Sequence, residues 1–464
     1  MKVRVLLVVY DNGSYIHEFP IGLGHIAGAL RRMGADVAVY SQDLHHYPDE
    51  HLTAYLDRNP FDMVGVSVIG GYYQYRKLLA LAAAINRSRN RPFFVIGGHG
   101  PAPEPEYFLR KTQADVAVIG EGEETVVDLV GALSAKRPLD TVPGIAFRDG
   151  DRVVVNPRRP LIADVDSIPW PAYDLFPMEH YRLGRMPMLG GSDFLVSMLS
   201  GRGCTFKCNF CYRMDEGFRP RASEGIVEEA LFLKKTYGAR YISFVDELLM
   251  SSVERTEEIC RAFIKAKSGL MWGCNGRLNY ARPDLLRLMK EAGCVFVNYG
   301  IESMDDTVLR NMNKALTTRQ VVRGVEATQA AGLTPGLNII FGNLGDTRET
   351  LEAGVEFLVK YDDCTILRTI RPVTPYPGSP LYYHAMEQGL LRDVEDFYEN
   401  KHLNSDLLAV NFTELSDDEF YEALVDANSR LVDNYFSKRR GRALEEVRRL
   451  YAERDATFRG FRQT

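Results

Sequence analysis

Short apolar runs alternate with amphipathic stretches along most of this chain, and this alternation is the feature that most constrains its fold. In the first part of the sequence, five runs are rich in β-branched residues and have the length of buried strands. These runs cover residues 3–9, 36–40, 63–68, 93–96 and 116–119. Each is followed by a stretch with helical period, at residues 22–33, 50–58, 74–86, 104–111 and 123–133. Five strand–helix units predict an α/β domain over residues 1–135, with a doubly wound, Rossmann-like parallel sheet that binds ligands at the carboxyl ends of its strands.

Residues 136–190 lose this alternation. Eight prolines interrupt the stretch, and two short apolar runs flank Asp149-Gly150-Asp151, which predicts a Pro-rich connector with a small hairpin. The alternation returns over residues 191–390, with strand patterns at 195–199, 241–245, 271–275, 296–301, 337–341 and 367–373. Six more strand–helix units predict a partial (βα)6 barrel, whose ligands would also bind at the carboxyl ends of the strands.

The rest of the chain, residues 391–464, has a helical and charged pattern that becomes basic after Arg430. A solvated helical cap on the barrel explains this pattern, and a nucleic-acid contact is the alternative. The net charge of −6 in 464 residues is too small to indicate a nucleic-acid or membrane partner. No run reaches the roughly 18 apolar residues that span a bilayer, and residues 1–9 have no signal-peptide cleavage site. We therefore expect a cytoplasmic protein without a membrane span.

Three of the seven cysteines, Cys204, Cys208 and Cys211, lie within eight residues, directly after the predicted strand at 195–199. This arrangement does not suit a disulfide framework and suits metal binding in a reducing compartment. No His, Asp or Glu in this loop can complete a tetrahedral zinc site. Three thiolates can hold three irons of a [4Fe–4S] cluster and leave the fourth iron open to a ligand. A zinc site, or a cluster that only transfers electrons, is the alternative.

The spacing C-x3-C-x2-C, with the aromatic Phe210 before the last cysteine, resembles the motif of the radical S-adenosylmethionine (SAM) superfamily. The resemblance implies a [4Fe–4S] cluster on Cys204, Cys208 and Cys211, with SAM bound to the open iron. It also implies reductive cleavage of SAM to methionine and a 5′-deoxyadenosyl radical. A reductant such as flavodoxin or ferredoxin would supply the electron.

Downstream segments resemble the strands that bind SAM in this superfamily. The predicted strand at 241–245 is followed by two acids, Asp246 and Glu247, one of which the resemblance places at the SAM amino group; capping of the next helix is the alternative. Arg277 matches a partner of the SAM carboxylate, which a fork of donors suits. The full set implied for SAM is Phe210, Tyr212, Asp246, Glu247, Asn275, Arg277, Glu302, Ser303 and Asn338.

Residues 19–30 read Phe-Pro-Ile-Gly-Leu-Gly-His-Ile-Ala-Gly-Ala-Leu and resemble a segment of the cobalamin-binding domain found before the barrel in B12-dependent radical SAM enzymes. Glycines at the strand ends of the first domain agree with a bound cofactor, because its close approach to the backbone leaves no room for a Cβ atom. The resemblance implies cobalamin contacts from Tyr10, Asn12, Ser67, Gly70, Gly71, Gly97, Gly98, Glu121 and Gly122. A flavin or nucleotide in this domain is the alternative.

No histidine ligand for cobalt is evident. The D-x-H-x-x-G motif of some cobalamin domains does not occur in residues 10–17. His45 and His46 follow the second strand, but the glycine that the motif requires after the histidine is missing there. We interpret both as polar loop residues, so the axial neighbour below cobalt stays open. The other cysteines are scattered and are expected to be buried core thiols; they are Cys260, Cys274, Cys294 and Cys364.

Together these resemblances imply a cobalamin-dependent radical SAM enzyme that methylates an unactivated carbon of a small-molecule or peptide substrate through methylcobalamin. They assign no side chain as a catalyst, because the cofactors carry the chemistry. A non-methylating radical reaction, similar to that of the anaerobic magnesium-protoporphyrin ester cyclase, is the alternative within enzymes. An iron–sulfur electron carrier or a regulatory binding module is the alternative outside them.

Overall fold

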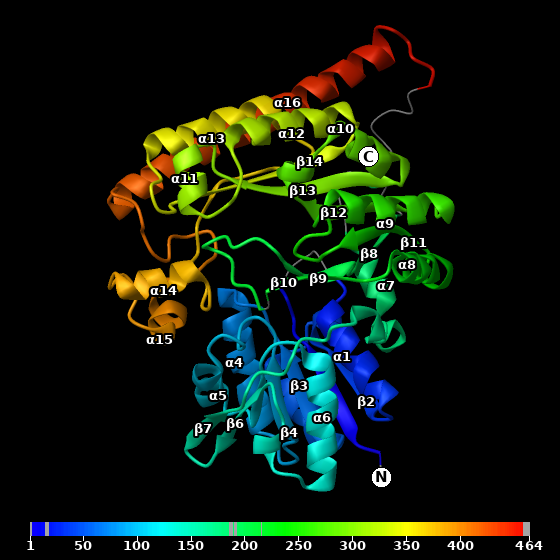
Figure 1. Ribbon diagram of the computed structural model, residues 1–464, viewed down its shortest axis with the longest axis vertical. Helices are drawn as coiled ribbons and strands as arrows, with labels where there is room; N and C mark the ends of the chain where they lie inside the picture. Colours follow the sequence, from blue (N-terminus) through cyan, green and yellow to red (C-terminus); the bar gives the residue numbers. More distant parts are fainter. Residues whose placement is uncertain (1, 14–17, 185–188, 190–192, 215, 458–464) are drawn as a thin grey trace.

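The computed structural model describes residues 2–13, 18–184, 189, 193–214 and 216–457. It has two α/β domains stacked along its long axis (Figure 1). The first domain, blue to cyan, holds the amino terminus, and the second, green to yellow, holds a sheet with helices along its outer side. The last long helix, orange to red, runs across the top of the second domain.

The first sheet has its strands in the order β2-β1-β3-β4-β5-β6-β7. The first five pair in parallel, and β6 and β7 add an antiparallel hairpin to the edge of β5. The strands are β1 (Arg4–Val9), β2 (Asp36–Ser41), β3 (Met63–Ser67), β4 (Phe93–Gly97), β5 (Val116–Val118), β6 (Ile145–Asp149) and β7 (Arg152–Val155). The expected doubly wound sheet is confirmed, and its five predicted strands lie within one residue of the observed bounds.

The small hairpin that the sequence places in the connector belongs to this first sheet. Ile145 of β6 pairs with Val118 of β5, and Phe147 pairs with Val116. In this position β6 covers an edge whose N–H and C=O groups would otherwise be unpaired. The sheet therefore extends past residue 135, the boundary expected from the sequence, because the strand–helix alternation ends before the sheet does.

Helices flank the first sheet: α1 (Ile21–Arg32), α2 (Gln42–His45), α3 (Asp49–Arg58), α4 (Tyr72–Asn86), α5 (Pro105–Thr112) and α6 (Gly122–Ala135). All except the short α2 were predicted, and their bounds lie within two residues of the expected ones. Side chains alternate between the two faces of the strands, so Leu7 and Val9 enter one core while Leu6 and Val8 enter another. Burial on both faces explains the continuous apolar runs of the sequence.

The connector packs closely on α1 through glycines. A Cβ atom on Gly28 would lie 2.5 Å from the carbonyl oxygen of Trp170, and one on Gly24 would lie 2.8 Å from the Pro171 side chain. The backbone N–H of Ala172 donates to the carbonyl of Gly24. Packing of the connector on α1 thus requires Gly24 and Gly28, which both belong to the segment 19–30.

The second sheet has its strands in the order β15-β14-β13-β12-β11-β8, all parallel. The strands are β8 (Phe194–Met198), β11 (Ala239–Phe244), β12 (Met271–Gly276), β13 (Cys294–Glu302), β14 (Thr334–Phe341) and β15 (Arg371–Pro372). Its helices are α8 (Ser223–Tyr237), α9 (Val253–Lys265), α10 (Pro283–Glu291), α11 (Asp306–Asn311), α12 (Thr318–Ala330) and α13 (Arg348–Tyr361). This arrangement confirms the partial barrel.

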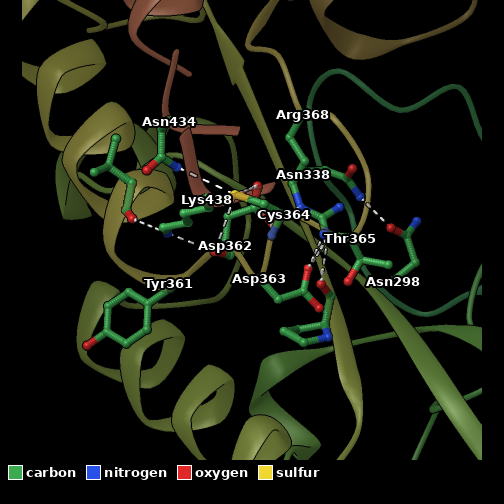
Figure 2. A network of polar contacts seen from close by, with 12 residues as sticks. Asn298, Asn338, Tyr361, Asp362, Asp363, Cys364, Thr365, Arg368, Asn434 and Lys438 are labelled. Carbon is green, nitrogen blue, oxygen red and sulfur yellow. Dashed lines mark hydrogen bonds and ion pairs between the residues drawn. The ribbon is translucent and has the colours of Figure 1, made fainter. Parts of the chain in front are cut away.

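The last strand, expected over residues 367–373, is only two residues long in β15. The preceding Arg368 turns into the protein, where its guanidinium donates to the Asp362 carboxylate at 2.8 Å and to the Pro335 carbonyl at 3.0 Å. Figure 2 shows this network beside Cys364. Pro372 also has no N–H for a ladder, so the strand stays short.

The chain after the barrel returns to the first domain and then crosses the barrel. It forms α14 (Pro380–Glu387), α15 (Val394–Asp396) and the long α16 (Asp417–Tyr451). One further short helix, α7 (Met178–Tyr181), lies earlier in the chain, in the connector. Tyr398 stacks on Tyr75 of the first domain with 4.5 Å between ring centroids. Among the described residues, no helix combines the length and the apolar character that crossing a membrane requires.

Replacing Gly28 by Ala should lower the free energy of unfolding by about 1–3 kcal/mol, because the new methyl group has no room beside the Trp170 carbonyl. Chemical unfolding followed by circular dichroism measures this change. Gly131 in α6 is the matched control, since no atom lies within 4 Å of the position of its Cβ. Ala there should stabilise by roughly 0.5–1 kcal/mol, and equal effects of the two substitutions would contradict the packing described.

Candidate functional site

The three clustered cysteines belong to a separate two-stranded ribbon and its connecting loop. The strands of the ribbon are β9 (Gly201–Cys204) and β10 (Gly217–Pro220), which pair antiparallel. Figure 1 shows this ribbon, β9 and β10, between the two domains. Cys204 ends β9, while Cys208 and Cys211 follow in the connecting loop. Gly203 has a φ of +86°, and a Cβ on it would lie 2.3 Å from the Gly217 carbonyl oxygen, so only glycine fits directly before Cys204. The sequence predicted the position of this loop but not the ribbon that carries it.

The thiols in this loop are free of disulfides and differ in acidity. Cys208 is buried. A hydrogen bond from the Cys211 thiol, together with the nearby Lys314 and Arg277 cations, lowers the pKa of Cys208 to about 6. Burial raises the pKa of the Cys204 thiol. Soft sulfur donors close together in one loop fit the chemistry of an iron–sulfur cluster. No three His, Cys, Asp or Glu side chains of the described chain are already arranged around one point as metal ligands, so the ligand assignment stays a prediction.

Two buried cations lie on one side of the cysteine loop. The Arg277 guanidinium stacks 3.5 Å from the centroid of the Phe206 ring and lies 4.0 Å from the Cys208 sulfur. It also donates to the carbonyl of Lys314. The Lys314 ammonium forms a buried ion pair with Glu302 at 2.8 Å and lies 5.6 Å from the ring of the predicted Phe210. Two cations beside the thiols favour their ionised form.

The site residues at the end of β13 are held in a constrained backbone. Glu302 has a φ of +71°, which is uncommon for a residue with a side chain. Its carboxylate is already paired with Lys314. The neighbouring Ser303 is buried, and its hydroxyl accepts a hydrogen bond from the backbone N–H of Asp305 at 3.2 Å. Both residues lie at the carboxyl end of the strand, as expected, and both already have partners.

The two acids that follow β11 have different positions. The Asp246 carboxylate is buried and accepts hydrogen bonds from the backbone N–H and the hydroxyl of Ser200. Burial raises the pKa of Asp246 to about 6. Glu247 is exposed and accepts from the N–H of Gly203 at 3.2 Å. Asp246 therefore fixes the start of the ribbon, and Glu247 is the acid that reaches solvent beside Cys204.

Three asparagines form a hydrogen-bonded ladder across β12, β13 and β14. Asn275 donates to the carbonyl of Asp246 at 2.8 Å and accepts from Asn298 at 3.0 Å. Asn298 in turn accepts from Asn338 at 2.8 Å, as Figure 2 shows. The sequence predicted Asn275 and Asn338 as site residues but missed Asn298. Aligning the strand ends would have found it, because Asn298 is the register partner of Asn275.

The predicted cobalamin residues Tyr10, Asn12, Ser67, Gly70, Gly71, Gly97 and Gly98 all lie in or beside the loops after β1, β3 and β4. These three strands are neighbours in the sheet, so their loops share one edge. Gly98 has a φ of +93°, and a Cβ on it would lie 2.5 Å from the carbonyl oxygen of Val68. Residues 14–17, part of the loop in which no histidine motif was found, lie outside the described residues.

Glu121 and Gly122, also predicted to contact cobalamin, lie against other residues of the chain. The Glu121 carboxylate binds Arg202 at 2.9 Å and Arg219 at 2.8 Å, which come from β9 and β10. Burial opposes ionisation of Glu121, but hydrogen bonds from Arg219 and Arg202 outweigh it and lower its pKa. Glu123 binds Arg202 as well, at 2.5 Å. A Cβ on Gly122 would lie 2.7 Å from the Ile26 side chain.

A cavity of about 210 Å³ lies beside this ionic network. It is lined by Ile119, Gly120, Glu121, Arg158, Arg159, Pro160, Leu161 and Glu216. The lining combines the loop after β5, the connector and the return of the cysteine loop. This cavity therefore lies where the first domain, the connector and the ribbon meet.

The buried His402 is a further residue that the sequence did not single out for the site. Neither ring nitrogen has a hydrogen-bond partner among the described residues. The ring stacks on Phe397 at 5.0 Å and meets the edge of Tyr376, which in turn lies beside Gly70. Burial lowers the pKa of His402 to about 4, so the imidazole is neutral. Burying a polar group without a partner costs roughly 1–3 kcal/mol. The unpartnered imidazole near the Gly70 loop therefore fits a cofactor whose peripheral amides can form a hydrogen bond with it.

Comparison with known proteins agrees with this geometry. Residues 198–358 match the family model of the Radical SAM superfamily, and residues 12–130 match that of the B12 binding domain. The chain is 31% identical over 403 residues to an uncharacterised methyltransferase of Pyrococcus horikoshii, covering 84% of this chain and 85% of that protein. The chain belongs to the radical SAM enzymes with a B12-binding domain. Its cofactors are a [4Fe–4S] cluster, SAM and cobalamin.

One further relative and one solved structure are less similar in sequence. The anaerobic magnesium-protoporphyrin IX monomethyl ester cyclase of Rubrivivax gelatinosus is 27% identical over 389 residues, covering 82% of this chain and 68% of that enzyme. Among solved structures, the radical SAM methyltransferase TsrM of Kitasatospora setae, with cobalamin and a [4Fe–4S] cluster bound, has a TM-score of 0.75 at 19% identity. The alignment covers 93% of this chain and 89% of TsrM. This likeness confirms the predicted order of domains and the fold.

Replacing Asp246 by Asn should change how stability depends on pH. The folded-state pKa of about 6 lies above the ordinary value of 3.8, so ionisation of Asp246 costs stability as the pH rises from about 4 to about 6. The wild-type free energy of unfolding should therefore fall by up to about 3 kcal/mol more than that of Asp246→Asn over this range. Unfolding titrations at several pH values measure the difference. The exposed Asp151→Asn is the control, and parallel curves for all three proteins would refute the expectation.

Proposed function

We propose that this protein is a cobalamin-dependent radical SAM methyltransferase that methylates an unactivated carbon of a small-molecule or peptide substrate. The observation that carries the proposal is the contact between the cysteine loop and the ligand-binding edge of the first sheet. Tyr212, next to Cys211, packs on His99 with 6.0 Å between ring centroids. His99 follows Gly98 in the loop after β4. A cluster loop touching a cobalamin loop suits a reaction in which two cofactors act on one substrate.

When bound, the cluster and SAM would supply a 5′-deoxyadenosyl radical and cobalamin would supply the methyl group; the protein supplies placement. Cys204, Cys208 and Cys211 would hold the cluster. Arg277 is preorganised by its stacking on Phe206, and its fork of donors suits the carboxylate of SAM. Glu247 is the exposed acid beside Cys204 and suits the amino group of SAM.

The asparagine ladder would line the substrate side of the barrel. Asn338 is exposed, while its amide nitrogen donates to Asn298 and to the carbonyl of Tyr299. These bonds fix the amide plane, and the amide oxygen accepts no hydrogen bond from a described residue. Such a fixed acceptor orients a ligand without taking part in proton transfer, which agrees with a reaction carried by cofactors.

The relatives favour two different reactions for the same site. The methyltransferase relatives favour methyl transfer, while the Rubrivivax gelatinosus cyclase favours a non-methylating oxidative ring closure. Incubation with methyl-labelled SAM and candidate substrates distinguishes them. Label in the product supports methylation, whereas 5′-deoxyadenosine formed with an unlabelled product supports the second candidate.

Replacing Cys208 by Ala should remove the cluster and the cleavage of SAM. We expect the anaerobically purified wild type to hold about four iron atoms per chain and the variant to lose most of them. Formation of 5′-deoxyadenosine should fall by at least about 100-fold, because the remaining thiolates cannot hold three irons. Iron analysis and chromatography of the products measure both effects.

Cys260→Ala in α9 is the matched control for this experiment, since Cys260 is buried in the core away from the cysteine loop. This control should keep its iron and its deoxyadenosine formation. An iron-replete, SAM-cleaving Cys208→Ala protein would disprove the ligand assignment.

Replacing Arg277 by Lys should weaken SAM binding about tenfold, or about 1.4 kcal/mol, because lysine keeps the charge but loses the planar fork. Equilibrium dialysis with labelled SAM and the cluster-loaded protein measures the dissociation constant. Arg282→Lys is the control, because Arg282 is exposed and pairs with Asp284. Equal affinities of wild type and Arg277→Lys would remove Arg277 from the SAM site.

A further inference from the structure

The long helix α16 packs on the barrel along one face only. Phe420, Leu424 and Leu431 are buried there, and Phe420 stacks on Phe341 with 4.8 Å between ring centroids. The helix begins at a capping box formed by Ser416 and Glu419, so its amino-terminal end is firmly fixed. In Figure 1 it lies along the outer surface of the second domain.

The opposite face of α16 carries an unpartnered apolar stripe. Val425, Phe436 and Val447 are 67%, 60% and 37% exposed. They are spaced eleven residues apart, which is close to three helical turns, so they share one side of the helix. That side lies roughly 150° around the helix from the buried face. We call this surface the outer stripe; Val432, Ala443 and Leu450 fall on it as well.

The carboxyl-terminal part of α16 extends beyond the barrel (Figure 1). The last hydrogen bond from the helix to the barrel runs from Arg442 to the carbonyl of Cys364 at 3.0 Å. Figure 2 shows the earlier anchors, Asn434 and Lys438, beside the same segment. Within the described chain, residues 443–451 make no hydrogen bond or ion pair to the barrel. A helical end of this length is marginal in water on its own, so a partner would stabilise it.

Charge along α16 is divided between its two halves. Acids dominate before Phe436, and bases dominate after it. Asp433 and Arg440 lie on the same edge of the outer stripe, three residues before and four residues after Phe436. Neither side chain forms a hydrogen bond or an ion pair with any described residue.

We propose that the outer stripe is the contact surface for a second copy of this chain, with the two α16 helices antiparallel about a two-fold axis near Phe436. Such an isologous contact uses the same surface on both copies. Asp433 would face Arg440 of the partner subunit, and the symmetry forms this ion pair twice. Phe436 would pack at the axis, and Val425 would meet the partner's Val447. The inference concerns assembly and does not depend on the proposed reaction.

The charge pattern argues against other occupants of the stripe. A parallel helix pair would place acids beside acids and bases beside bases, which repel. An anionic membrane surface would be repelled by Glu422, Asp426 and Asp433, which lie alongside the first half of the stripe. Of these three arrangements, the antiparallel copy alone matches both the apolar spacing and the reversal of charge.

Light scattering after size-exclusion chromatography, over a range of protein concentrations, tests the proposal. The wild type should show a mass about twice the 52.4 kDa of one chain. Asp433→Arg and Arg440→Asp should each raise the dimer dissociation constant at least about tenfold, because each places two like-charged pairs at the axis. The double variant Asp433→Arg with Arg440→Asp should recover the dimer, because the ion pairs are restored with reversed sign.

Glu445→Arg is the matched control, since it makes the same charge change on the same helix but on the side facing away from the stripe. It should leave the dimer intact, and circular dichroism of every variant should show unchanged helix content. A monomeric wild type at all concentrations would overturn the proposal. So would a double variant that stays as dissociated as the single variants, or a dimer that also survives Phe436→Glu.

Discussion

The buried ionic network between Glu121, Glu123, Arg202 and Arg219 is the interaction on which the arrangement of this protein depends. Two acids come from the start of α6 in the first domain, and two arginines come from the ribbon that carries Cys204. Arg202 precedes Cys204 by two residues, so its position limits where the first thiol can lie. Buried ion pairs of this kind add little net stability but strongly penalise any geometry that leaves one charge alone. The network therefore selects one placement of the ribbon against the first domain.

Most of the fold could be predicted because burial on both faces of a parallel sheet leaves a continuous apolar run in the sequence. Strands such as β1 and β3 have this signal, and the helices between the strands have a clear period. The β6–β7 hairpin could be seen locally, but nothing in the sequence assigned it to the edge of β5. The ribbon β9–β10 was missed because a glycine-rich strand such as Gly201–Cys204 has almost no apolar side chains to give a period.

The site was predictable where chemistry requires a residue type in a fixed spacing, as in the cysteine loop. It was less predictable where a side chain acts through contacts formed by folding. The resemblance placed Glu121 beside cobalamin, and nothing in the sequence indicated that Arg202 and Arg219 also bind its carboxylate. Gly28 looked like part of a cofactor motif, although the connector requires its lack of a side chain. Asn298 could have been found only by aligning the strand ends, and the contact of His402 with Tyr376 beside the Gly70 loop forms only on folding.

The aromatic contact of Tyr398 with Tyr75 and Tyr107 has a consequence for biosynthesis. The first domain is complete in sequence by about residue 155, yet part of its α4–α5 surface is covered by residues that the ribosome makes some 240 positions later. Until then the nascent chain presents an apolar surface to the cell. This surface can be covered only after the barrel has been synthesised. Docking of the segment around Tyr398 on the first domain is therefore a late step of folding.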